Sequence, residues 1–119
     1  MASSNRSEGR GAENAVLGRV PRISKLLALA IKMRDQLRKG KVADFTAMAA
    51  VGHISKPRLS QILSLTNLAP EIQEVLLFLP KNHRGPDPIT EALMRPIAAQ
   101  VDWSLQKQRF RELLNRVQS

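Results

Sequence analysis

The stretch VGHISKPRLSQILSL, residues 51–65, places a turn between two short apolar patterns. Gly52 and His53 belong to the residue types that accept left-handed backbone angles, so a preceding helix is predicted to end there. Ser55 stands where the N-cap of a second helix belongs. Pro57 falls in the first turn of that helix, where a missing N–H removes no helical hydrogen bond. The proline is therefore predicted to start the second helix and not to break one.

Two short helices are predicted on either side of this turn. Asp44 can cap the first, which runs from Phe45 to about Val51. The second carries an apolar stripe, formed by Leu59, Ile62 and Leu63. Two short helices joined by a tight turn, with the small Ala49 where they cross, match the spacing of a helix-turn-helix over about residues 44–67.

The second helix is the predicted DNA reader, because such a helix lies in the major groove with its N-terminal residues at the bases. Arginine and lysine reach guanine, glutamine pairs with adenine, and serine donates to bases or phosphates. The predicted DNA-binding residues are Ser55, Lys56, Pro57, Arg58, Ser60, Gln61 and Ser64. Arg58 can also turn sideways toward a phosphate. The alternative interpretation is an ordinary helical hairpin with a polar surface.

The length of the chain indicates one small domain, and its composition favours a polyanionic partner. The 119 residues hold 19 Lys and Arg against 10 Asp and Glu, which gives a formal net charge of +9. Nucleic acid is the commonest partner of so basic a chain. With one Trp and three Phe, the chain offers few of the exposed aromatics on which single-stranded nucleic acid stacks. The lack of Cys excludes disulfides and thiolate metal sites, so we expect a cytoplasmic, nucleoid-associated protein.

The first part of the chain is divided at Pro21. Residues 1–20 are rich in Ser, Gly, Asn and charge without an apolar period, which predicts a flexible, disordered basic arm. After Pro21, apolar residues recur at helical spacing up to Gly40, the predicted end of a helix. Five basic residues of this helix are candidate phosphate contacts: Lys25, Lys32, Arg34, Arg38 and Lys39. A solvated charged face explains them equally well.

The downstream half predicts supporting helices over residues 70–117, which complete an all-α fold of about five to six helices. Pro70 suits a first helical position, and PKNHRGPDP, residues 80–88, indicates a loop. Thr90 can cap the next helix, which Pro96 is expected to interrupt or restart.

A final helix, capped by Asp102, carries an apolar side. Its members are Trp103, Phe110, Leu113, Leu114 and Val117. Such a stripe is usually core, and the alternative is a homodimer that reads two half-sites about one helical turn apart. The same helix is the partner surface in an alternative function, that of a protein-interaction or recombinase-accessory module.

The segment DFTAMAAVGHISKPRLSQILSLTNLAPEIQEVLLFL, residues 44–79, resembles the helix-turn-helix of ParB/KorB-like DNA-binding proteins. In those proteins a recognition helix is followed by L-x-L-x-x-L-x-P-x-I. The matching residues here are Leu63, Leu65, Leu68, Pro70 and Ile72. The resemblance implies a helix-turn-helix that binds double-stranded DNA. It does not extend to nucleotide binding, because the G-x-R-R arginine patch of the partition proteins has no counterpart in this sequence.

Over about residues 23–117 the chain is more similar to small proteins of bacterial mobile elements encoded beside site-specific recombinases. The shared motifs are GHIS at 52–55, DPITE at 87–91, RPIA at 95–98 and DW at 102–103. This resemblance implies a regulator or accessory factor of a mobile element, with a recombinase as a candidate protein partner.

Catalysis is not expected. No P-loop, Rossmann glycine pattern or G-x-S-x-G sequence is present. His53 and His83 are the only histidines, and neither stands four residues from another ligand-type residue on a convincing helix. Both are more easily explained as turn and loop residues, so we expect no metal and no cofactor. The longest apolar run, LLALAI at 26–31, is far too short for a membrane span, and no membrane partner is expected.

Overall fold

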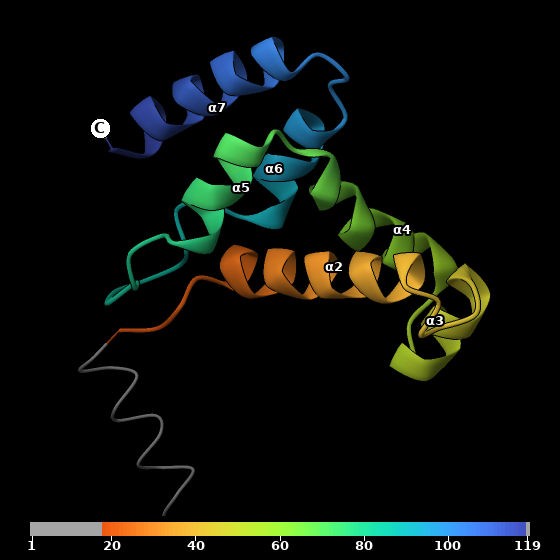
Figure 1. Ribbon diagram of the computed structural model, residues 1–119. Coiled ribbons are helices and arrows are strands. Elements are labelled where there is room, and N and C mark those ends of the chain that lie inside the picture. Colours follow the sequence, from red (N-terminus) through yellow and green to blue (C-terminus); the bar gives the residue numbers. More distant parts are fainter. Residues whose placement is uncertain (1–17, 119) are drawn as a thin grey trace, which may run out of the picture.

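The computed structural model describes residues 18–118, and its regular structure there is helical (Figure 1). The elements in order are α2 (Arg22–Arg38), α3 (Phe45–Gly52), α4 (Lys56–Ser64), the 3-10 turn η1 (Leu65–Asn67), α5 (Pro70–Leu77), α6 (Glu91–Ala98) and α7 (Trp103–Gln118). Within residues 18–118 the only strand-like pairing is one backbone bridge, between Arg19 and Asn82. The predicted all-α fold of five to six helices is confirmed. The predicted arm, residues 1–20, lies outside the described residues except for its last three.

The long helix α2 runs along one side of the molecule, with the α3–α4 pair at its C-terminal end and α5 near its N-terminal end (Figure 1). Ile23, Leu27 and Ala30 recur at helical spacing and are buried. The helix ends as predicted, because Gly40 takes a left-handed φ of 72° and donates its N–H to the carbonyl of Leu37 at 3.2 Å.

Two hydrophobic clusters build the core, and α2 joins them. The larger lies where the first half of α2 meets η1 and helices α5, α6 and α7, with Leu27, Leu76 and Met94 fully buried. The smaller holds the helix-turn-helix together and consists of Met48, Ala49, Leu59 and Leu63. Met33 and Leu37, from the second half of α2, pack against this smaller cluster. Burial of α4 against α2 therefore fixes α4 on the rest of the domain.

Pro96 does not interrupt a helix, so that prediction is wrong. Helix α6 continues from its cap at Thr90, whose hydroxyl accepts from the N–H of Leu93 at 3.3 Å, through Pro96 to Ala98. Proline removes one hydrogen bond, to the carbonyl four residues earlier. That residue is Ala92, which is exposed, so its carbonyl can meet water. Burial on the opposite side keeps the helix in place.

Helix α7 lies along the outer edge of the domain and supports it through part of the predicted stripe (Figure 1). Phe110 and Leu113 are buried, and Leu114 and Val117 pack against the larger cluster. Trp103 is 50% exposed and does not belong to that core. Of the predicted dimer surface, only Trp103 is left substantially open; the other side chains serve the core of their own chain.

Candidate nucleic-acid interface

The turn between α3 and α4 is formed by a histidine in a glycine-like conformation. His53 has φ 54° and ψ 39°, the left-handed region, and is the only residue other than glycine with positive φ among residues 18–118. Gly52, which the sequence grouped with it, is still the last residue of α3. The N–H of Ile54 returns to the carbonyl of Ala49 at 3.1 Å, which closes the turn.

Side-chain caps fix the starts of both helices, as predicted. Asp44 accepts a hydrogen bond from the N–H of Ala47 at 2.8 Å, and Ser55 accepts one from the N–H of Arg58 at 3.1 Å. Pro57 lies in the first turn of α4. These caps satisfy amide groups that a helix start leaves unpaired, so they define where α3 and α4 begin.

The polar side of α4 faces solvent, while its apolar side is buried. Leu59, Ile62 and Leu63 are at most 5% exposed. Exposed residues at the start and on the polar side of α4 are Ser55, Lys56, Pro57, Ser60 and Gln61. The structure therefore brings five of the seven predicted DNA-binding residues together on one open surface.

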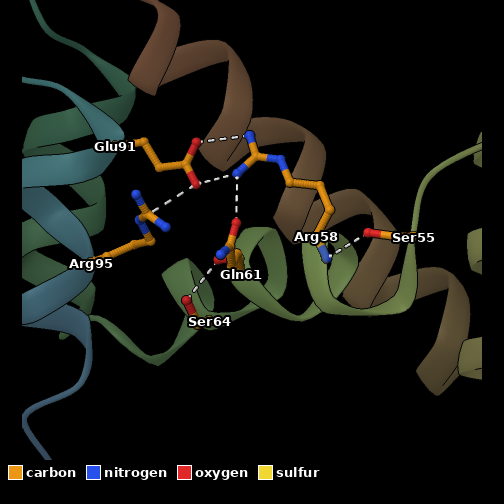
Figure 2. Close-up of polar contacts among 6 residues, drawn as sticks. All are labelled: Ser55, Arg58, Gln61, Ser64, Glu91 and Arg95. Atoms are coloured by element: carbon orange, nitrogen blue, oxygen red, sulfur yellow. Dashed lines mark hydrogen bonds and ion pairs between the residues drawn. The ribbon is translucent and has the colours of Figure 1, made fainter.

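The sixth predicted residue, Ser64, is turned back onto its own helix. It is half-buried, and its hydroxyl donates to the carbonyl of Gln61 at 2.6 Å (Figure 2). The hydroxyl hydrogen of Ser64 is thus used within α4, and a contact from Ser64 to DNA would rely on its acceptor oxygen or on rotation of the side chain.

The seventh, Arg58, is held by a carboxylate from α6. Its Nη1 donates to Glu91 Oε2 at 2.5 Å and its Nη2 to Glu91 Oε1 at 2.8 Å, a two-point ion pair (Figure 2). The same Nη1 donates to Gln61 Oε1 at 3.1 Å. Arg58 is therefore oriented by two partners, one on its own helix and one 33 residues later.

Both members of this pair are electrostatically suited to remain charged. The hydrogen bond from Arg58 lowers the pKa of Glu91 below its ordinary value of 4.5, although burial opposes this. The same hydrogen bond raises the pKa of Arg58. Arg95, one turn along α6, brings its Nε to 3.8 Å from Glu91 Oε2 and lowers the pKa of Glu91 further. Two guanidinium groups thus share one carboxylate.

Asp87, four residues before Glu91, makes a second tie of the same kind. It forms an ion pair with Arg19 at 3.0 Å and accepts from the backbone N–H of Arg22, at the start of α2, also at 3.0 Å. Burial by itself would raise the pKa of Asp87, but the hydrogen bonds, led by that from Arg22, outweigh it, so the pKa lies below 3.8. The segment DPITE therefore uses both its carboxylates to hold other parts of the chain.

An open groove of about 760 Å³ lies beside this cluster, between the start of α2, the segment before α6 and α6 itself. Its cationic lining consists of Arg19, Arg22, Lys25, Arg58 and Arg95. Two carboxylates, those of Asp87 and Glu91, also line it. Five positive charges against two negative ones leave an excess of three, which favours an anion on this side of α4.

The candidate phosphate contacts on α2 fall into two groups. Lys25 and Lys32 are exposed. The guanidinium of Arg34 instead donates to the carbonyl of Leu63 at 3.2 Å and to the hydroxyl of Thr66 at 3.0 Å, which ties α2 to the end of α4.

Arg38 and Lys39 both pair with Asp35, at 2.6 and 3.0 Å. Hydrogen bonds from Lys39 and then Arg38 hold the pKa of Asp35 below its ordinary value of 3.8. Because Arg38 and Lys39 are themselves exposed, pairs of this kind contribute little to stability and exchange readily with other anions.

Across residues 18–118, no three His, Asp or Glu side chains gather as a metal ion would need. No helix in that range is both long and apolar enough to cross a bilayer. Sequence reasoning missed Glu91 as a partner of α4, because its only signal was that of a first-turn helix residue. No family model, curated protein or solved structure matches this chain.

Proposed function

We propose that this protein binds double-stranded DNA in a sequence-specific manner through the helix-turn-helix of α3 and α4, as a regulator or accessory factor of a mobile element. The observation that carries the proposal is the exposed polar side of α4. This helix is capped by Ser55 and is held to the domain by a buried apolar stripe. A helix presented in this way fits the major groove.

Side chains on α4 and α2 are the candidates for contacts to bases and phosphates in such an interface. Lys56 at the start of α4 brings a positive charge to a helix end that already favours anions. Gln61, on the exposed side, has the amide that can pair with adenine. The exposed Lys25 and Lys32 on α2 are candidates for phosphate contacts, and the net charge of +9 attracts a polyanion from a distance. We place the protein at the nucleoid in the cytoplasm.

Selection of binding sites from random duplexes, followed by a salt titration on the selected and a random duplex, tests the proposal. The selected duplex should be preferred at every salt concentration. Affinity should fall about a hundredfold or more between low and physiological salt if about five phosphates are contacted. Failure to enrich any sequence, or binding that does not change with salt, would contradict the proposal.

A second candidate function is protein interaction at the start of α7. Val101 is 95% exposed and Trp103 is 50% exposed, and an exposed Trp beside an exposed aliphatic residue is common at interfaces. This surface could serve a second copy of the chain, as the homodimer requires, or a recombinase. Sedimentation of the wild type and of Trp103→Ala, with and without the selected duplex, would distinguish a dimer that depends on Trp103 from a monomer.

A further inference from the structure

The ion pair of Arg58 with Glu91 links the proposed reading helix to α6, a helix outside the helix-turn-helix (Figure 2). The Glu91 side chain is 18% exposed and that of Arg58 is 40% exposed, so the pair is partly shielded from water. A two-point, charge-assisted pair in such a place is stronger and more directional than one on an open surface. It therefore restricts where the guanidinium of Arg58 can lie.

The ion pair uses the N–H groups on one edge of the Arg58 guanidinium and leaves those on another edge without a hydrogen bond to the described part of the chain. Glu91 takes a hydrogen from Nη1 and one from Nη2, and Gln61 takes the second hydrogen of Nη1. The Nε–H and the second Nη2–H, which point in the same direction, make no hydrogen bond to residues 18–118. Two parallel donors of this kind match the O6 and N7 acceptors of guanine or two oxygens of one phosphate. Arg58 thus offers one defined edge to a ligand.

We propose that Glu91 is a specificity-determining residue of the DNA interface, which fixes Arg58 so that it binds an acceptor pair at one position and not the nearest phosphate. This inference rests on the proposed function. On random DNA, an unrestrained arginine can turn to any phosphate within its reach and adds affinity without discrimination. Glu91 denies Arg58 that freedom, and Arg95 behind it stabilises the carboxylate charge on which the restraint depends.

The test compares the wild type with Glu91→Gln, Arg58→Ala and the double variant, on the selected duplex and on a random duplex. Glu91→Gln retains the size of the side chain and removes its charge. We expect its preference for the selected duplex to fall about tenfold. Its affinity for random DNA should rise, with a salt slope steeper by about 0.9, the equivalent of one added phosphate contact. Circular dichroism checks that each variant is folded.

Removing a negative charge could also favour DNA in a general way, and two comparisons separate that effect. In the Arg58→Ala background, Glu91→Gln should no longer alter the preference, because the restraint acts only through Arg58. Glu74→Gln, which removes one exposed carboxylate from α5, should leave the preference at the wild-type level. If Glu91→Gln changes the preference equally with and without Arg58, or does not change it, the inference is overturned.

The failure of the inference is distinguishable from the failure of the proposed function. If the wild type selects no sequence, the proposed function fails and the inference fails with it. If the wild type selects a sequence and Glu91→Gln keeps the full preference, only the role of Glu91 is wrong.

Discussion

The backbone N–H of Ala69 donates to the side-chain oxygen of Gln106 at 2.8 Å, 37 residues further along the chain. The amide nitrogen of Gln106 donates in turn to the carbonyls of Gln100 at 2.7 Å and Asn67 at 3.2 Å. Gln106 is fully buried. This one side chain therefore satisfies three backbone groups and fastens α7 to the segment that follows the proposed reading helix.

Gln106→Leu should destabilise the protein by about 3 kcal/mol, because leucine fills a similar volume but leaves buried backbone groups without partners. Chemical denaturation of the two proteins measures the difference. Gln108→Leu, at an exposed position of the same helix, should stay within about 0.5 kcal/mol of the wild type. Equal stabilities for Gln106→Leu and the wild type would show that this network contributes nothing.

Gln61→Ala should lose discrimination at one base pair of the selected duplex, at a cost of roughly 1–3 kcal/mol there and little on random DNA. The reason is the exposed position of Gln61 on the polar side of α4, where its amide N–H₂ can donate to a base while its Oε1 accepts from Arg58. Competition binding with duplexes substituted one base pair at a time measures it. Gln108→Ala on α7 is the matched control and should change nothing. Equal losses on selected and random DNA would show that Gln61 does not read a base.

His53→Val should destabilise the protein by about 1–2 kcal/mol, because a β-branched residue is strained at a φ of 54°. His53→Gly should cost much less, because glycine adopts the left-handed region without strain. Thermal melting of both variants makes the comparison. Equal melting temperatures for the two variants would show that the left-handed backbone conformation does not decide which residue is tolerated at position 53.

Stability should fall in acid, in part through Glu91. Its pKa is lower in the folded protein than the ordinary 4.5, so its stabilising contribution is complete above that value and is lost as the pH falls through the folded pKa. Asp87, whose pKa is also depressed, acts with the same sign. The melting temperature of the wild type should therefore exceed that of Glu91→Gln at about pH 6, and the gap should narrow toward about pH 3. A gap independent of pH would contradict this.

The local signals of the sequence predicted the helix-turn-helix well. Asp44, Ser55 and Thr90 each cap a helix through an N–H three residues later, so the cause and the result lie within one turn. The apolar stripe of α4 was equally readable, because helical periodicity decides which side of a short helix is buried. These parts of the fold depend on neighbours in sequence and need no knowledge of the tertiary structure.

The features that the sequence did not predict depend on contacts between residues that are distant in the chain. Helical spacing places Gln106 on the same side of α7 as the buried Phe110 and Leu113, but its partners Ala69 and Asn67 lie far away in the sequence. Pro96 is tolerated because burial of its neighbours holds α6 together. Nothing in the sequence around position 91 indicates that Glu91 pairs with Arg58, which lies 33 residues earlier in the chain. Long-range pairing of this kind cannot be derived from propensity or period alone.

The ion pair between Arg58 and Glu91 limits how the proposed DNA-reading segment can be moved to another protein. A chimera that carries only residues 44–67 on a foreign scaffold would keep the full sequence of α3 and α4. It would lose Glu91, the partner that orients Arg58. Arg34, which binds the carbonyl of Leu63 from α2, would be missing as well. Such a graft should bind DNA loosely and with altered preference. A transplant of the proposed reading surface has to extend at least from α2 through α6, because residues from all of that span hold Arg58 and the end of α4 in place.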